Sequence, residues 1–527
     1  MTDDESTLRS GCQGTPPLTA RLEPWARQLL SDPEACAELL EQYGSPLNVH
    51  DFSPLPRNAE ELVRVAETNG VDLRVFVARK ANKTLGMVRA ARRAGLGMDV
   101  GSERELRQVL DDGVSPRDVV VTAAVKPAPL LHLALTSRSL VVLDNLDEVA
   151  ATRRAAEHTA LARRERGTGC SPDPFPVALR LAPTPGDLVP PTRFGESAAT
   201  WLHLIDTLGL GDLLRVDGIH FHLHGYDPVA RTTALAEALD LLDRLRERGM
   251  AREDAFIDIG GGIPMSYLDS PHEWEAFWQA HDDALLTSEH SGPDDRDSER
   301  SEGERAPLLW RDRPLKQVYP YHQQLTRARW LDTVLRGEIR PGLTAARALR
   351  EREVQLRCEP GRSMLDGCGL TLARVIQRTT TSDGIPLVGL EMNRTQCRST
   401  SDDFLVDPVL VHTGGQPSEA FEGFLVGAYC IEEELILRRR LAFPYGVAVG
   451  DVLALPNTAG YLMHILESAS HQIPLASNVE HVGGVGGVGG VGGVGDVHSD
   501  PQQGRADTRV VRDFERDGID GVLPMRP

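Results

Sequence analysis

Cysteine is scarce in this chain of 527 residues, and the few thiols are scattered. No CxxC pair occurs and the total of seven is odd, which argues against a disulfide framework and against a structural zinc site. We therefore expect reduced, mostly structural thiols. The cysteines are Cys12, Cys36, Cys170, Cys358, Cys368, Cys397 and Cys430.

Long apolar runs and excess positive charge are also missing. No stretch reaches the ~18 continuous apolar residues of a membrane helix. The formal net charge of −20 disfavours binding to nucleic acid or anionic lipid. The first residues, MTDDEST, lack the charged-then-apolar pattern of a signal peptide. These absences predict a cytoplasmic enzyme with a small-molecule substrate and no nucleic-acid or membrane partner.

Eight short apolar runs, each with a polar or glycine residue at its last or next-to-last position, alternate with stretches of helical spacing. This alternation is typical of a (β/α)₈ barrel, in which the chemistry lies at the carboxyl ends of the strands. The predicted strands are 74–80, 95–100, 118–123, 140–145, 176–181, 215–223, 255–262 and 354–362.

Composition divides the chain into five parts. Ser288–Arg305 is charged and turn-rich, short strand-like pieces follow Arg362, and VGG repeats fill Val482–Gly495. These features predict a TIM barrel followed by an all-β domain. The expected parts are a disordered N-terminus (1–17), a helix and strand that join the β domain (18–51), the barrel (52–367, with an insertion at about 269–340), the β domain (368–478) and a disordered Gly-rich tail (479–527).

Lys80 ends the first predicted strand. Burying an ammonium without a partner costs several kcal/mol, so such a lysine is either ion-paired or chemically active. From Lys80 alone, the two interpretations have equal weight.

Residues near the ends of the seventh and eighth predicted strands could bind an anion and pair with a ring nitrogen. Gly260, Gly261 and Gly262 follow AFIDI, where bare backbone amides can approach a phosphate. In EPGR, Arg362 could grip a phosphate and Glu359 could hold a proton on a ring nitrogen. A tight turn and a local salt bridge are the alternative interpretations.

His220, His222 and His224 alternate along the sixth strand and so share one face. Such a set can indicate a metal site, but no carboxylate pattern completes it, and an imidazole lying flat on an aromatic cofactor is an equally good explanation. We therefore predict no metal. Cys430, in GAYC, is either buried filler or an acid catalyst.

Together, these motifs resemble the fold-type III pyridoxal-phosphate (PLP) decarboxylases, with diaminopimelate decarboxylase nearest in layout. ARKANK, FHLHG, DIGGG, EPGR and the late pair GAYC and NTAGY occur in the family's order, and the resemblance spans about residues 45–475. It implies an alanine racemase-like barrel with a C-terminal β-sandwich or Greek-key barrel.

The resemblance also implies roles for individual residues. Lys80 would bind PLP as a Schiff base, His222 would stack on the ring, and Cys430 would reprotonate Cα, with each active site shared across a homodimer. Glu359 would pair with the ring nitrogen. The phosphate would be held by Gly260, Gly261, Gly262, Arg362 and Tyr461, with Gly361 also at the cofactor. Residues expected near the cofactor or just behind it are Asp99, Glu105, Arg180 and Arg193.

Two departures bear on the substrate. Relatives have an acidic residue after the cysteine that reads a distal ammonium, and here Ile431 stands in its place. The usual Gly-Ser after the stacking histidine is His224-Gly225, which removes a hydroxyl. We therefore expect decarboxylation of an unusual or conjugated amino acid, with Arg394 and Arg398 as candidate contacts for a distal carboxylate.

Two other functions remain open on the same scaffold. A PLP-dependent racemase or epimerase needs an acid or base on each face of Cα, usually lysine opposite tyrosine, and the GAYC context favours the decarboxylase. A catalytically silent PLP-binding homologue is favoured by Ile431 and the missing serine. The retention of Lys80, Glu359 and Cys430 opposes it.

Overall fold

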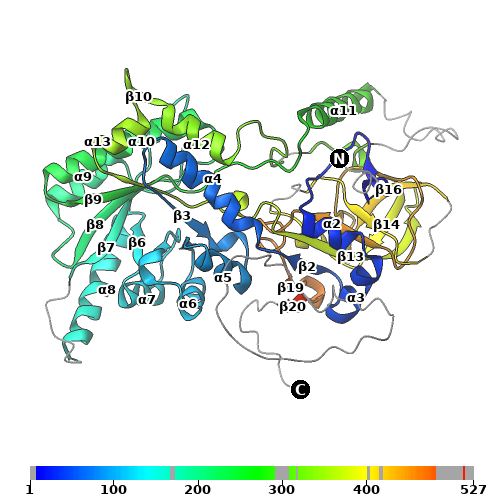
Figure 1. Ribbon diagram of the computed structural model, residues 1–527, viewed down its shortest axis with the longest axis horizontal. Helices are drawn as coiled ribbons and strands as arrows, with labels where there is room; N and C mark the ends of the chain where they lie inside the picture. Colours follow the sequence, from blue (N-terminus) through cyan, green and yellow to red (C-terminus); the bar gives the residue numbers. More distant parts are fainter. Residues whose placement is uncertain are drawn as a thin grey trace, which may run out of the picture.

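The structure is a computed structural model, and it describes residues 8–165, 173–290, 308–315, 318–399, 404–414, 419–481 and 514–516. A barrel and a β-rich domain lie side by side along the long axis (Figure 1). Within the described ranges, no helix has both the length and the apolar character needed to cross a bilayer.

All eight predicted barrel strands are present, and they close into a parallel barrel in the order β12-β3-β4-β5-β6-β7-β8-β9. The predicted fold class is confirmed. Because the strands are parallel, their carboxyl ends meet at one rim. The strands are β3 (Leu73–Ala78), β4 (Gly97–Val100), β5 (Val119–Val121), β6 (Leu140–Leu143), β7 (Phe175–Arg180), β8 (Leu214–His220), β9 (Ala251–Asp258) and β12 (Gln355–Cys358).

Helices cover the outside of the barrel, and their apolar faces form one continuous core with the strands. Local capping defines several starts: Ser102 Oγ accepts a hydrogen bond from the Glu105 amide at the start of α6, and Glu105 Oε2 accepts one from the Gly101 amide. The helices are α4 (Pro54–Thr68), α5 (Leu85–Arg93), α6 (Glu103–Asp111), α7 (Ala128–Ser137), α8 (Leu146–Glu165), α9 (Ala198–Thr207), α10 (Pro228–Glu247), α12 (Arg327–Arg336) and α13 (Ala345–Glu351).

The segment between β9 and α12 packs on the second domain. Its helix α11 (Pro271–His290) lies away from the barrel (Figure 1). Phe277 shares a core with β-domain side chains, and the Trp310 amide donates to the Arg438 carbonyl. By contrast, α12 packs against α4 as a barrel helix. The insertion therefore ends before α12, earlier than residue 340, and its charged middle lies outside the described residues.

The second domain is built on a largely antiparallel sheet with the order β1-β17-β16-β14-β13-β2-β19-β20; β18 pairs with β13 and β15. Strand β2 comes from the N-terminal part of the chain and pairs with β13, beneath the helices α2 (Pro24–Leu30) and α3 (Pro33–Tyr43). The strands are β1 (Gln13–Gly14), β2 (Leu47–His50), β13 (Gly369–Thr380), β14 (Pro386–Leu390), β15 (Val409–Val411), β16 (Phe421–Val426), β17 (Leu441–Phe443), β18 (Val452–Pro456), β19 (Ser477–His481) and β20 (Phe514–Arg516).

Both expected disordered ends need correction where the structure describes them. Strand β1 pairs with β17, and the Gly14 and Leu18 amides donate to Asp407, so disorder is wrong for residues 8–17. At the other end, Val479–His481 belongs to β19, which pairs in parallel with β2. The VGG repeats lie outside the described residues.

Candidate active site

The barrel rim brings Lys80 onto a buried carboxylate. Lys80 lies in the short helix η1 (Arg79–Ala81) directly after β3, and Asp99 lies on the neighbouring strand β4. Lys80 Nζ lies 3.1 Å from Asp99 Oδ2, and the Thr122 hydroxyl donates to Asp99 Oδ1. The Asp99 side chain is 1% exposed, whereas that of Lys80 is 48% exposed. The carboxylate is therefore fixed from behind, and the amine faces an open space.

The charge of Asp99 is the main cause that raises the pKa of Lys80 above its usual value, against the opposing effect of burial. Tyr461 and Glu359 act in the same direction. In the cofactor-free protein, Lys80 is therefore an ammonium at neutral pH. It becomes a nucleophile only when a proton leaves Nζ.

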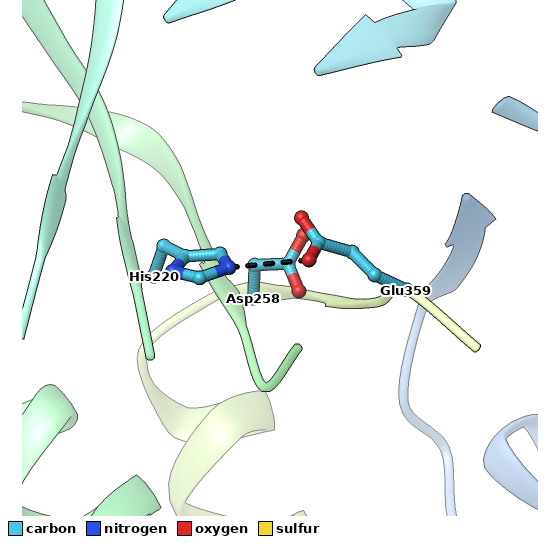
Figure 2. A group of neighbouring side chains, drawn as sticks. All are labelled: His220, Asp258 and Glu359. Carbon is cyan, nitrogen blue, oxygen red and sulfur yellow. Dashed lines mark hydrogen bonds and ion pairs between the residues drawn. The ribbon is translucent and has the colours of Figure 1, made fainter. Parts of the chain in front are cut away.

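A second buried cluster lies inside the same rim, formed by His220, Asp258 and Glu359 (Figure 2). His220 ends β8, Asp258 ends β9, and Glu359 follows β12. His220 Nε2 lies 3.2 Å from Glu359 Oε2, and Asp258 Oδ1 accepts a hydrogen bond of 2.8 Å from the Gly260 amide. Glu359 Oε1 and Asp258 Oδ2 have no hydrogen-bond partner among the described residues.

Burial sets the protonation state of this cluster. It raises the pKa of Asp258 to about 8, with the charge of Glu359 as the next cause. Burial and then Asp99 raise the pKa of Glu359 as well, and burial lowers that of His220 to about 3. The imidazole is therefore neutral, and the two carboxyls hold protons until a positive group arrives.

Asp258→Asn is expected to flatten the pH dependence of stability in the cofactor-free protein. The folded-state pKa of Asp258 lies above its unfolded value, so the native state binds the extra proton and loses stability as pH rises from about 4 to 8. The cost is at most about 1.4 kcal/mol per pH unit for one such carboxyl. Urea unfolding at pH 5 and pH 8 measures it. An equal pH dependence in wild type and variant would contradict this assignment.

Three glycines after β9 form a tight cradle beside His222. A Cβ at Gly260 would lie 2.6 Å from the Phe221 carbonyl, and one at Gly261 would lie 2.8 Å from the Glu359 carbonyl. Gly260 also has φ +68°, a conformation that favours glycine. Burial is the first cause that lowers the pKa of His222 well below its usual value, so this ring is neutral too. A small anion can reach the bare backbone here.

Arg362 lies close to two aromatic rings, Tyr319 of the segment between β9 and α12 and Tyr461 of the β domain. Its Cζ lies 4.3 Å from the centre of the Tyr319 ring and 5.4 Å from that of Tyr461. Its two terminal nitrogens donate to Tyr267 Oη at 2.9 Å and to Ser399 Oγ at 3.0 Å. Gly361 is required beside them because a Cβ there would collide with Tyr461 Oη. The guanidinium is thus held rigidly in a site rich in hydroxyl groups.

Ion pairs behind the rim fix Arg180. Arg180 Nη1 pairs with Asp144 Oδ1 at 2.8 Å, and the guanidinium lies 4.3 Å from the centre of the Phe194 ring. The Cζ atom of Arg193 lies 4.1 Å from the centre of the same ring, and the ring meets His222 edge-on. These contacts orient the face that His222 presents.

A further buried pair, Lys126 and Glu148, lies next to Asp144. Lys126 Nζ donates to both oxygens of Glu148, and Glu148 also accepts from the Asp144 amide. Sequence reasoning missed this pair, considered His220 only as one of three histidines on a strand face, and gave no role to Asp258, Thr122, Asp144, Tyr267 or Tyr319. Asp144 directly follows the observed strand β6 and Asp258 ends β9, and a polar residue at the carboxyl end of a barrel strand is the signal that could have identified them.

Cys430 stands apart from this cluster. Its side chain is exposed, and no contact within the described chain joins it to Lys80 or Glu359. The loop that carries it is firmly held: the Ala428 amide donates to the Met392 carbonyl at 2.8 Å. The thiol therefore projects outward from an ordered loop.

Arg394 and Arg398 fix the Cys430 loop from behind. Arg398 Nη2 donates to the Leu435 and Ile436 carbonyls, and Arg394 Nη1 donates to the Glu433 carbonyl. Arg394 Nε also lies 3.6 Å from Glu434 Oε2. These contacts give both arginines a scaffold role, and their contact with a distal carboxylate stays a prediction.

The site as a whole fits PLP. It offers an accessible amine for the aldehyde at Lys80, a buried carboxyl with one unbonded oxygen for the ring nitrogen at Glu359, and a neutral imidazole for the ring face at His222. The glycine cradle and Arg362 suit the phosphate.

Comparison with known proteins agrees with this fit. Residues 58–293 match the family model "Pyridoxal-dependent decarboxylase, pyridoxal binding domain". Uncharacterized protein y4yA of Sinorhizobium fredii is 28% identical over 82% of this chain and 87% of its own length. Diaminopimelate decarboxylase of Zymomonas mobilis is 28% identical over 45% of this chain and 56% of its own length. The crystal structure of diaminopimelate decarboxylase from M. jannaschii in complex with L-lysine superposes with a TM-score of 0.61 at 18% identity, over 84% of this chain and 88% of that chain.

Proposed function

Because this chain belongs to the fold-type III PLP-dependent decarboxylases, we propose that it is an amino-acid carboxy-lyase with PLP attached at Lys80. The observation that carries the proposal is the pairing of β3 with β12, which places the accessible amine of Lys80 and the buried carboxyl of Glu359 on neighbouring strands at one rim. An amine for an aldehyde and an acid for a ring nitrogen are the two groups that this chemistry needs.

In this proposal, Lys80 holds the cofactor covalently, and Asp99 orients Nζ through the ion pair of 3.1 Å. His222 supports the ring face, with Phe194 and Arg180 behind it. Arg362, Tyr461 and the amides of Gly260, Gly261 and Gly262 hold the phosphate, and Gly361 leaves room for the Tyr461 hydroxyl. The Tyr267 and Ser399 hydroxyls keep the guanidinium of Arg362 in place.

Bound PLP supplies an electron sink for the pair of electrons left when CO₂ departs from the substrate. With PLP bound, Glu359 would hold a proton at the ring nitrogen, and the positive charge there would offset the cost of burying the ionised carboxylate. His220 keeps Glu359 in place through the bond to Oε2. Asp258 keeps its own proton, because a second buried negative charge would repel Glu359.

Cys430 is proposed to return a proton to the substrate carbon in the site of a second copy of this chain, since its exposed thiol has no access to Lys80 of its own chain through any described contact. Cys430→Ala is expected to lower kcat by about 10²–10⁴-fold, the usual contribution of a general acid. Decarboxylation assays on the purified variant measure this.

Mixing the inactive Lys80→Ala and Cys430→Ala proteins should restore partial activity, because a hybrid dimer regains one complete site. Refolding or co-expressing the two variants supplies the hybrid, and each variant alone is the control. No recovery in a demonstrated hybrid would exclude shared sites.

We propose that this site does not recognise a distal ammonium group on its substrate. Ile431 follows Cys430 and is 43% exposed, so no acid stands directly after the thiol. Of the glutamates that follow it, Glu433 pairs with Arg313 and Arg438, and Glu434 lies near Arg394. An apolar side chain at 431 suits an amino acid with an apolar or conjugated end.

The direct test is CO₂ release from a panel of amino acids with PLP-saturated protein. The panel contains lysine, ornithine and meso-diaminopimelate, together with amino acids that carry apolar, carboxylate or conjugated side chains. We expect turnover in the second group and a much lower kcat/KM for the three diamino acids. Absence of CO₂ from every compound would reject a decarboxylase, and exchange of the Cα hydrogen without CO₂ would indicate a racemase.

A further inference from the structure

The loop that carries Lys80 rests on a segment of the β domain. The Tyr461 amide donates to the Ala81 carbonyl at 2.7 Å. Asn82 Nδ2 donates to the Ala459 carbonyl at 3.1 Å, and the Lys83 amide donates to His464 Nδ1 at 3.2 Å. Three hydrogen bonds therefore hold consecutive residues of the lysine loop, 81–83, from the second domain.

The third of these bonds requires one tautomer of His464. Asn478 Nδ2 donates to the Ala476 carbonyl, so Asn478 Oδ1 is the acceptor on that side chain. His464 Nε2 lies 3.0 Å from this oxygen and must carry the proton. His464 Nδ1 is then left as the lone pair that receives the Lys83 amide.

A second histidine shares the same oxygen. His50 Nε2 also lies 3.0 Å from Asn478 Oδ1, and the His50 and His464 rings stack with centres 6.1 Å apart. His50 and His464 are fully buried, and Asn478 is 4% exposed. Burial lowers the pKa of both imidazoles, so neither is charged near neutral pH. The three side chains come from β2, the segment after β18, and β19.

We propose that His464, oriented by Asn478 and His50, is a positioning residue that fixes the lysine loop so that Lys80 reaches the cofactor. The inference rests on the proposed role of Lys80, but the clamp itself can be measured without PLP. It assigns a function to β19, which is far from Lys80 in the sequence: Asn478 accepts from His464 Nε2 and so favours the tautomer whose Nδ1 accepts from Lys83.

The test compares His464→Asn with His464→Phe. Asparagine places an acceptor oxygen near the position of Nδ1, whereas phenylalanine keeps the ring volume and removes both nitrogens. Amide hydrogen exchange of the peptide around Lys83 is followed by mass spectrometry in cofactor-free protein. We expect exchange at Lys83 to be about tenfold faster or more in the phenylalanine variant, a factor that corresponds to about 1.4 kcal/mol, and near wild type in the asparagine variant.

PLP release from the loaded proteins is the second measurement. It should be faster for His464→Phe and for Asn478→Leu than for wild type, and His464→Asn should restore most of the retention. His471→Phe is the matched control, because His471 is an exposed histidine whose contacts are a stack on Tyr429 and a hydrogen bond to its neighbour Ser470, away from the lysine loop. This control should change neither measurement.

Unchanged exchange at Lys83 in folded His464→Phe would overturn the clamp, as would faster exchange in the His471 control. If His464→Phe does not fold, His464→Gln answers the same question, because it can still donate to Asn478 but has no acceptor at the Nδ1 position. Faster exchange without any PLP bound to wild-type Lys80 would reject the proposed function and leave the clamp standing.

Discussion

Lys80→Ala is expected to abolish both covalent retention of PLP and turnover. The loss in kcat should exceed about 10³-fold, the scale seen when an attacking side chain is removed. The reason is local: Lys80 is the amine that faces the open rim, whereas the neighbouring Lys126 is fully paired with Glu148 and the Ala123 carbonyl. Borohydride reduction followed by peptide mass spectrometry identifies the attachment site.

Lys83→Ala is the matched control for this experiment. The Lys83 side chain is exposed, three residues away on the same loop, and only its backbone amide joins the contact to His464. It should retain the pyridoxyl adduct at position 80. An adduct on any other residue of the wild-type protein, or an adduct that persists in Lys80→Ala, would remove the basis of the proposed function.

Glu359→Gln is expected to lower kcat by about 10²–10³-fold while PLP remains bound, the range found when one preorganised electrostatic group is removed. Glutamine keeps the volume and can still bond to His220, but it cannot carry the negative charge that stabilises a protonated ring nitrogen. The cofactor-free variant should also be more stable than wild type at pH 8, because a buried carboxyl with a raised pKa no longer has to ionise.

Steady-state decarboxylation gives kcat, and the visible spectrum of the loaded protein gives cofactor content. Glu351→Gln is the control, since Glu351 pairs only with Arg347 on the outer helix α13, away from the rim. A wild-type kcat in a PLP-loaded Glu359→Gln protein would show that the ring nitrogen is not governed by this carboxyl.

Strand ends were predictable from the sequence because period and apolarity are local properties. The run RVFVARK ends on Lys80. Asp99, the three glycines 260–262 and Glu359 likewise lie at or near the ends of their own predicted runs. Parallel strands in a closed barrel bring their carboxyl ends to one rim, so these residues had to meet once the barrel formed. The cofactor, PLP, was predicted from the order of the motifs, which resembles that of a known family.

The hydrogen-bond partners of these side chains could not be predicted from the sequence. The bonds from His220 to Glu359 and from Asn478 to His464 join residues that are distant in sequence or in different strands, and their geometry depends on strand register. The prediction of disorder for residues 8–17 was wrong for a similar reason. They are polar and turn-rich, yet Asp407 and strand β17 give their backbone partners that composition does not reveal.

The sequence by itself determined the barrel, the second β domain and the side chains that end each strand, since these follow from the local pattern of apolar and polar residues. Only the tertiary structure decided which of those side chains are charged, which arginines serve as scaffold, and what holds the lysine loop. Those properties depend on burial and on contacts between distant segments, because removing water changes the cost of charge and leaves each buried donor in need of an acceptor.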